Sequence, residues 1–182
     1  MTETTVLSDT PRAQREEPEN EDRTQRNAAR AEAVAAVARE FAAAVDEEGR
    51  FPREAIDEAR TQGLLGAPMS EADGGLGWSI TELCRMLERV GRECTSTAMI
   101  LAMHHSQTLC LTRHADTEYL RDFTRRVATE GLLLASATTE VNIGGNTRSS
   151  TCAVRPAGDG RVHLQMPWCR TYRCLLLNMR VQ

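Results

Sequence analysis

The chain has 182 residues, of which 41% are apolar and 4% are aromatic. This length suits one ordinary domain, or one helical domain with the start of another. The net charge of −4 argues against a broad phosphate-binding surface, so we expect no nucleic-acid partner. All 22 basic residues are arginine, and without lysine this sequence has no Schiff-base or lysine-nucleophile chemistry.

Six cysteines occur without CxxC spacing: Cys84, Cys94, Cys110, Cys152, Cys169 and Cys174. The N-terminus is polar and acidic, unlike a signal peptide, so we expect reduced thiols in the cytoplasm, acting as small apolar side chains. No apolar run approaches the length that crosses a membrane, and we expect no membrane partner.

The N-terminal part begins with Met1–Asn27, which is rich in charged and polar residues and predicts a disordered tail. An Ala-rich stretch over Ala28–Val45 predicts the first helix. Pro52 is suited to a first helical position, and Gly63 to the residue just past a helix end, so a second helix is expected between them.

A loop is expected over Leu64–Gly77. Ser79 and Glu82 then have the spacing of a capping box, in which each side chain bonds the other's backbone. The helix that follows has an apolar face that we assign to Ile80, Leu83, Cys84, Leu87 and Val90.

Thr95–Arg113 predicts a long helix that is apolar on most sides and therefore central. Asp116 or Thr117 is expected to cap a short amphipathic helix that ends near Val127.

The pattern changes near Glu130. Leu132–Ala137 is short and apolar, and Thr151–Val154 and Arg161–Leu164 flank a Gly-Asp-Gly turn typical of a hairpin. The expected fold class is mainly α, with an all-helical domain over 28–130 followed by the opening strands of a β domain over 131–165.

Two clusters of residues are weighed as sites and set aside. The glycines within residues 74–77 lack the preceding strand that a dinucleotide-binding loop needs, which favours a structural turn. His104, His105, Cys110 and His114 do not share one helix face at the spacing that metal ligands require, so we expect no metal site.

Several segments occur in an order that resembles acyl-CoA dehydrogenases. They are Phe51-Pro52 at a helix start, Gly63–Pro68, Gly74–Gly77, Arg92–Ala98, and a small-residue strand running into Thr139-Glu140-Val141-Asn142-Ile143-Gly144-Gly145. The resemblance covers roughly residues 28–165, about half of a family member. It implies a helical domain, a central β domain and a C-terminal bundle, with FAD between the last two.

The resemblance also implies roles for particular residues. Ser136, Thr138 and Thr139 correspond to the strand along the flavin ring, whose amides and a threonine hydroxyl favour negative charge on the reduced ring. Gly144 and Gly145 correspond to a turn where the backbone approaches cofactor and thioester.

On the long helix, Met99, Ala102, Met103 and Ser106 correspond to positions that line the acyl-chain cavity. Plain core packing is the alternative for these four residues. Acyl-CoA, an electron acceptor and a homo-oligomer are the partners implied by the family.

The catalytic glutamate of the family lies in the C-terminal bundle, which this chain lacks, so we assign no catalytic residue. We expect weak or absent FAD binding and no activity for this chain alone. A flavin monooxygenase of the same fold, with His104 or His105 facing substrate, and a non-enzymatic truncated product are the alternative readings.

The last 17 residues, 166–182, contain no acidic residue and no clear strand pattern. Back-translation of Gln165–Cys169 in another frame yields family-like strand sequence. We therefore expect residues 166–182 to be a frame-shifted tail without a stable fold.

Overall fold

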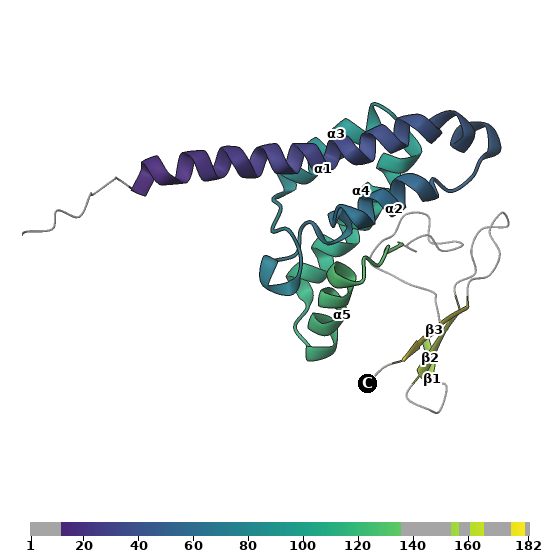
Figure 1. Cartoon of the computed structure of the whole chain (residues 1–182). Helices are drawn as coiled ribbons and strands as arrows, with labels where there is room; N and C mark the ends of the chain where they lie inside the picture. Colours follow the sequence, from purple (N-terminus) through teal and green to yellow (C-terminus); the bar gives the residue numbers. More distant parts are fainter. Residues whose placement is uncertain (1–11, 136–153, 157–160, 166–175, 181–182) are drawn as a thin grey trace, which may run out of the picture. The chain divides into compact units, whose positions relative to one another are not determined.

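The computed structural model describes residues 12–135, 154–156, 161–165 and 176–180, and the chain divides into two compact units, Met1–Leu134 and Ala135–Gln182. The first unit is helical (Figure 1). Its elements are α1 (Arg12–Glu48), α2 (Arg53–Thr61), the short 3-10 turns η1 (Leu64–Gly66) and η2 (Glu71–Asp73), α3 (Ile80–Gly91), α4 (Thr95–His114) and α5 (Glu118–Thr129). The predicted mainly helical fold class is confirmed. No helix in the described part of the chain is long and apolar enough to cross a membrane.

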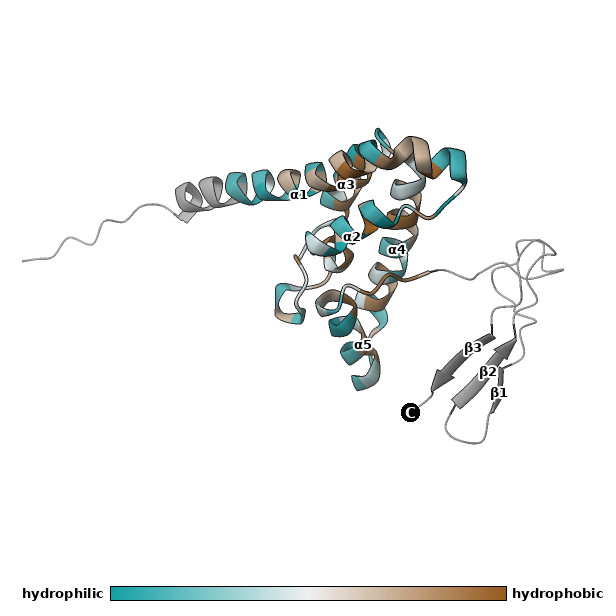
Figure 2. Cartoon of the chain, turned by 45° about the vertical axis from the view of Figure 1, so that its right-hand side comes forward, coloured by the Kyte–Doolittle hydropathy of each residue, from teal (hydrophilic) through white to brown (hydrophobic). Residues whose placement is uncertain are grey.

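Helix α1 begins well before the predicted start at Ala28, and the expectation of disorder is wrong from Arg12 onward. Its N-terminal turns project beyond the other helices (Figure 1), and the first turns of α1 that Figure 2 colours are hydrophilic. Tertiary contacts explain part of the extension. Arg23 Nη2 donates to the Gly77 carbonyl at 3.0 Å, and Asn27 Nδ2 donates to Glu82 Oε1 at 2.8 Å. Partners 54 and 55 residues away hold these turns in place.

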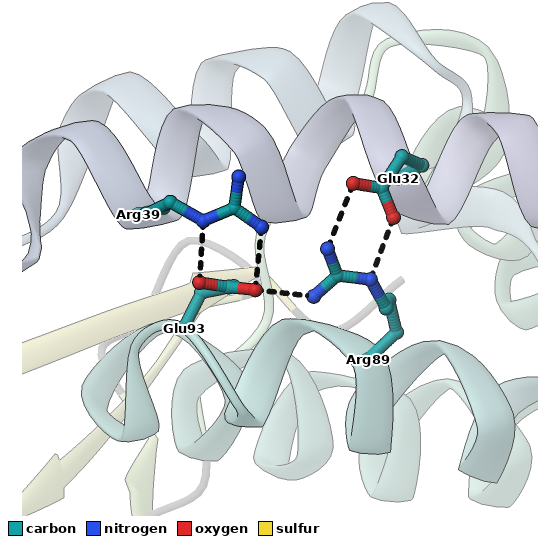
Figure 3. A network of polar contacts seen from close by, with 4 residues as sticks. All are labelled: Glu32, Arg39, Arg89 and Glu93. Atoms are coloured by element: carbon teal, nitrogen blue, oxygen red, sulfur yellow. Dashed lines mark hydrogen bonds and ion pairs between the residues drawn. The ribbon is translucent and has the colours of Figure 1, made fainter.

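A four-residue ion network joins α1 to α3 (Figure 3). Arg89 donates to both Glu32 oxygens at 2.6 and 2.7 Å and to Glu93 Oε1 at 2.6 Å. Arg39 donates to both oxygens of Glu93 at 2.7 Å. These hydrogen bonds, Arg39 first and Arg89 second, lower the pKa of Glu93 to about 2. Bidentate geometry fixes the register of the two helices as well as attracting their charges.

Helix α3 has the predicted capping box, since Ser79 Oγ accepts from the Glu82 amide at 3.3 Å and the Ser79 amide donates to Glu82 Oε2 at 2.7 Å. Its buried face is Leu83, Met86 and Val90. The predicted face was rotated, because Ile80 and Cys84 are exposed while Met86 is buried. The buried residues fit a spacing of three and four and pack against α1.

The hydrophobic core of the first unit is mostly aliphatic, as the aromatic content of 4% leads one to expect. It is built from α1, α2, η1, α3 and α4 and consists of Ala31, Val34, Ala35, Ala38, Val45, Ala55, Ile56, Ala59, Leu64, Leu65, Ala67, Trp78, Leu83, Met86, Val90, Cys94 and Leu101. Cys94 acts as the expected small core residue, whereas Cys84 and Cys110 are exposed.

The loop between α2 and α3 uses its own backbone donors. The amides of Gly75, Gly77 and Trp78 donate to the carbonyls of Ser70, Met69 and Ala67 at 2.9, 2.7 and 2.8 Å. Those three donors are therefore not free for a phosphate. The interpretation as a structural turn is confirmed, as is the end of α2 before Gly63, which has φ +71.

Helix α5 is capped as predicted, by Thr117, whose hydroxyl accepts from the Leu120 amide at 3.2 Å. The structure assigns no strand to residues 132–135, the described part of the predicted strand over residues 132–137.

The second unit contains β1 (Val154–Pro156), β2 (Arg161–Gln165) and β3 (Leu176–Arg180), antiparallel in the order β1-β2-β3. The β1–β2 pairing, with Val154 opposite Leu164, confirms the hairpin. Strand β3 lies within residues 166–182 and pairs with β2 along its full length. That this tail has no stable fold stays a prediction. The frame-shifted origin of this tail stays a prediction.

Candidate functional site

Helix α4 buries mainly polar side chains and exposes apolar ones. Its buried residues are Thr97, Leu101, His104, His105 and Thr108, four of them polar. Met99 and Met103 are 59% and 43% exposed. At 100° per residue these two sets lie on opposite sides of the helix. The predicted long helix is confirmed, but two of its apolar residues, Met99 and Met103, are exposed in the described unit.

The four residues predicted to line an acyl chain lie on one face of α4. Relative to Met99, the positions of Ala102, Met103 and Ser106 are i+3, i+4 and i+7, the spacing of a single helix face. Ala102 is partly buried and Ser106 is exposed. The alternative of core packing does not fit Met99, Met103 and Ser106, whose side chains are exposed.

The hydroxyl of Ser106 is already engaged on this face. Its Oγ donates to the Ala102 carbonyl at 2.9 Å, a local bond back along the helix. The face is thereby made less polar than its sequence suggests. Two flexible methionines, a small alanine and an internally bonded serine form a surface suited to an aliphatic chain. We call these four residues the α4 apolar face.

Behind this face, His104 joins three segments of the first unit. Its Nε2 lies 2.7 Å from the Leu65 carbonyl, and the Leu134 amide donates to its Nδ1 at 3.0 Å. Because Nδ1 accepts, the proton of the neutral ring is on Nε2, which donates to Leu65. Burial lowers the pKa of His104, with the bond to Leu65 opposing the shift. The neutral ring is therefore the form present at neutral pH.

The neighbouring His105 is also buried, and neither ring nitrogen has a hydrogen-bond partner among the described residues. Its ring stands edge-on to that of His104, with centroids 5.0 Å apart. Burial, and secondly the charge of His104, lowers the pKa of His105 to about 3. In the monooxygenase alternative either histidine would face a substrate; in the structure both side chains are buried.

The predicted flavin contacts, Ser136, Thr138, Thr139, Gly144 and Gly145, lie outside the described residues. Within the described residues there is no group of three or more His, Cys, Asp or Glu side chains placed to hold a metal ion.

A separate groove of about 250 Å³ lies between α1 and α3. Its lining includes the buried residues Ala31, Trp78 and Met86, together with Glu32 and Arg89 of the ion network. None of its lining residues comes from α4, so this groove is not part of the α4 apolar face.

Sequence reasoning did not find the bridging role of His104. Its partners Leu65 and Leu134 are 39 and 30 residues away, and no local pattern points to them. The apolar face, by contrast, was reached through the resemblance.

Solved structures identify the class of fold. FMN-bound TdsC from Paenibacillus sp. A11-2 superimposes with a TM-score of 0.62 at 22% identity, covering 75% of this chain and 34% of that one. KijD3 in complex with dTDP gives a TM-score of 0.60 at 28% identity, covering 79% and 36%. Most of this chain thus shares its fold with about a third of each of these proteins.

The sequence comparison identifies the family. Residues 19–131, more than half of the chain, match the family described as acyl-CoA dehydrogenase, N-terminal domain, and the chain belongs to this family. Among curated relatives, cyclohex-1-ene-1-carbonyl-CoA dehydrogenase of Geobacter metallireducens is 34% identical over 113 residues, covering 61% of this chain and 30% of that protein. The probable acyl-CoA dehydrogenase fadE25 of Mycobacterium bovis is 30% identical over 118 residues, covering 65% and 30%. The chain spans about a third of the length of these relatives.

Proposed function

We propose that this chain is the N-terminal part of a cytoplasmic, FAD-dependent oxidoreductase that, when whole, forms a double bond between the α and β carbons of an acyl-CoA thioester. The chain supplies the acyl-side wall of the site. We assign no general base to it, and we propose that it is inactive alone.

The exposure of the α4 apolar face is the observation that carries this proposal. Met99 and Met103 leave apolar surface exposed, on neighbouring positions of a helix whose opposite side is already packed. An exposed apolar patch marks a surface that is covered in the working protein. A methionine-rich face adapts to chains of different shape, as an acyl-chain cavity requires.

The flavin is proposed from family membership and from the residues after Ala135. The small residues Ser136, Thr138 and Thr139 fit a strand whose backbone lies against a ring, and Gly144 with Gly145 fits a close backbone approach. When bound, the flavin would accept the hydride that leaves the substrate β carbon. This chain's own residues orient the thioester and its acyl chain.

Equilibrium dialysis of the full chain against butyryl-, octanoyl- and dodecanoyl-CoA, with free CoA as reference, tests the acyl wall. Affinity is expected to rise with chain length, because each buried methylene contributes about 0.8 kcal/mol. Met103→Asp is expected to remove the dependence on length. Ile80→Asp, a matched change at another exposed apolar residue, on α3, is expected to keep it. Equal affinity for acyl-CoA and free CoA would contradict the proposal.

The flavin part has its own test. The purified chain is expected to hold no stoichiometric FAD after gel filtration, because one wall of a flavin site leaves the ring open to water. A yellow protein that keeps its flavin through the column would contradict this expectation.

The monooxygenase of the same fold is the second candidate, since the fold is shared with FMN-bound TdsC. The burial of His104 and His105 argues against it in the form in which either ring faces the substrate. If the chain does retain flavin, acyl-CoA-dependent reduction of an artificial electron acceptor supports the dehydrogenase. Oxygen uptake with reduced flavin would support the monooxygenase.

A further inference from the structure

The segment Gly131–Leu134 closes the first unit and is fastened to it at several points. The chain leaves α5 through Gly131, whose φ is +62, and the Leu132 amide donates to the Val127 carbonyl at 3.1 Å. Leu133 packs against the aliphatic core. Figure 2 shows this segment in apolar colours up to the grey trace. It is therefore held as part of the helical unit.

Arg60 of α2 fastens the start of this segment. Its Nε donates to the Gly131 carbonyl at 3.0 Å. A Cβ atom at position 131 would overlap the Arg60 side chain, and the positive φ is strained for any side chain. Glycine is thus required both by the turn and by the close approach of Arg60.

His104 fastens the end of the segment. Leu134 donates its amide to Nδ1, and Nε2 donates to Leu65 at the start of the α2–α3 loop. One buried ring therefore satisfies two backbone groups from segments 69 residues apart, while its own backbone belongs to α4. A residue without an acceptor at the Nδ1 position would leave the Leu134 amide unpaired.

We propose that His104 is a positioning residue that fixes the backbone of Leu134 relative to α4. It thereby sets where the chain departs toward Ser136, the first of the proposed flavin contacts two residues later. The ring and the α4 apolar face share one helix, so a displacement of α4 also displaces Leu134. We call the two hydrogen bonds of the His104 ring, to Leu65 and Leu134, the His104 latch. Its role in placing a flavin contact rests on the proposed function, but the hydrogen bonds themselves do not.

Two substitutions separate the two hydrogen bonds of the ring. His104→Asn keeps an oxygen at the position of Nδ1 and loses the donor to Leu65. His104→Gln keeps a donor near the position of Nε2 and loses the acceptor for Leu134. Hydrogen exchange of the Leu134 amide, measured by NMR on the full chain, is the readout. The Leu132 amide, which bonds Val127 and not His104, is the internal reference.

Exchange at Leu134 is expected to become about five- to tenfold faster in His104→Gln, as for the loss of one neutral hydrogen bond. It is expected to stay within about twofold of wild type in His104→Asn, and exchange at Leu132 to change in neither. Equal acceleration in both variants, or in neither, would mean that the ring only fills space, and would overturn the proposal.

A measurement on the wild-type chain covers the case in which a variant does not fold. Ring ¹⁵N shifts are expected to show a neutral His104 protonated at Nε2. Protonation at Nδ1 would overturn the latch directly. If the exchange and ¹⁵N results support the two hydrogen bonds but the chain does not bind acyl-CoA in dialysis, only the proposed function is contradicted. If the latch fails and acyl-CoA binds, the proposed function stands without it.

Discussion

Helices α3 and α4 pack against each other but divide their residues in opposite ways. Helix α3 buries Leu83, Met86 and Val90 and turns its charged residues outward. Helix α4 buries His104, His105 and two threonines and leaves Met99 and Met103 exposed. The first distribution is that of a helix that stabilises its own domain.

The second distribution indicates a helix that serves two purposes. Its polar side is accommodated inside the unit through specific contacts such as those of His104. Its apolar side contributes little to the stability of the unit, because it is not covered there. Such a side belongs to a surface that another part of the protein, or a ligand, covers.

The strongest way to break this comparison is to truncate one methionine on each helix. Met86→Ala removes a side chain that is 1% exposed, and a loss of about 2–5 kcal/mol in the free energy of unfolding is expected. Met103→Ala, at 43% exposed, is expected to change it by no more than about 0.5 kcal/mol. Urea unfolding of the full chain, followed by circular dichroism, measures both. A comparable loss for both variants would show that the α4 apolar face is covered within the chain.

The second prediction concerns acid sensitivity of the buried side of α4. The pKa of His105 is about 3 in the folded chain against an ordinary value of 6.5, so the unfolded chain takes up the proton first. Stability from the neutral ring is fully present above pH 6.5 and is lost as pH falls toward 3, with a slope of up to about 1.4 kcal/mol per pH unit. Between pH 6.5 and pH 5, the free energy of unfolding of His105→Leu is expected to fall by about 2 kcal/mol less than that of wild type.

The matched control for that measurement is Thr97→Val. Thr97 is buried on the same side, and its hydroxyl has no partner among the described residues. This change alters an unpaired polar group without removing a titrating one, so the slope with pH should equal that of wild type. If His105→Leu also retains the wild-type slope, the acid sensitivity arises elsewhere.

The third prediction tests the cap of α3. Ser79→Ala removes the hydroxyl that accepts from the Glu82 amide, and about 1 kcal/mol of stability should be lost. Ser96→Ala, at an exposed position in the first turn of α4, whose N-cap residue is Cys94, should cost much less. Thermal unfolding of both variants compares them. A similar cost at both positions would mean that the capping box contributes nothing beyond an ordinary surface serine.

What the sequence predicted well is what local chemistry determines. Ser79 with Glu82, Thr117 and Gly63 act on residues within one turn, so the ends of α2, α3 and α5 could be placed before the structure was known. The β1–β2 hairpin has the same local character. Its strands are joined by a short turn whose residues signal it.

What the sequence did not predict depends on distant partners. The start of α1 rests partly on Arg23 and Asn27 contacting residues more than 50 positions away. The burial of the polar side of α4 depends on His104 bonding Leu65 and Leu134, 39 and 30 residues away. The pairing of β3 with β2 likewise joins segments that no short pattern links.

The smallest expected effect sharpens the comparison on the α4 side alone. Ala102 is small and partly buried on the α4 apolar face, so Ala102→Phe should fill part of the space proposed for the acyl chain. Each methylene that loses its contact forfeits about 0.8 kcal/mol, which is roughly a fourfold weaker dissociation constant. In equilibrium dialysis of the full chain, the affinity for dodecanoyl-CoA should therefore fall relative to the affinity for butyryl-CoA. Ala36→Phe, at an exposed alanine of α1, introduces the same ring away from this face and should leave the ratio unchanged. An unaltered ratio in Ala102→Phe, with an intact fold, would place the acyl chain away from Ala102 and leave Met99 and Met103 to some other partner.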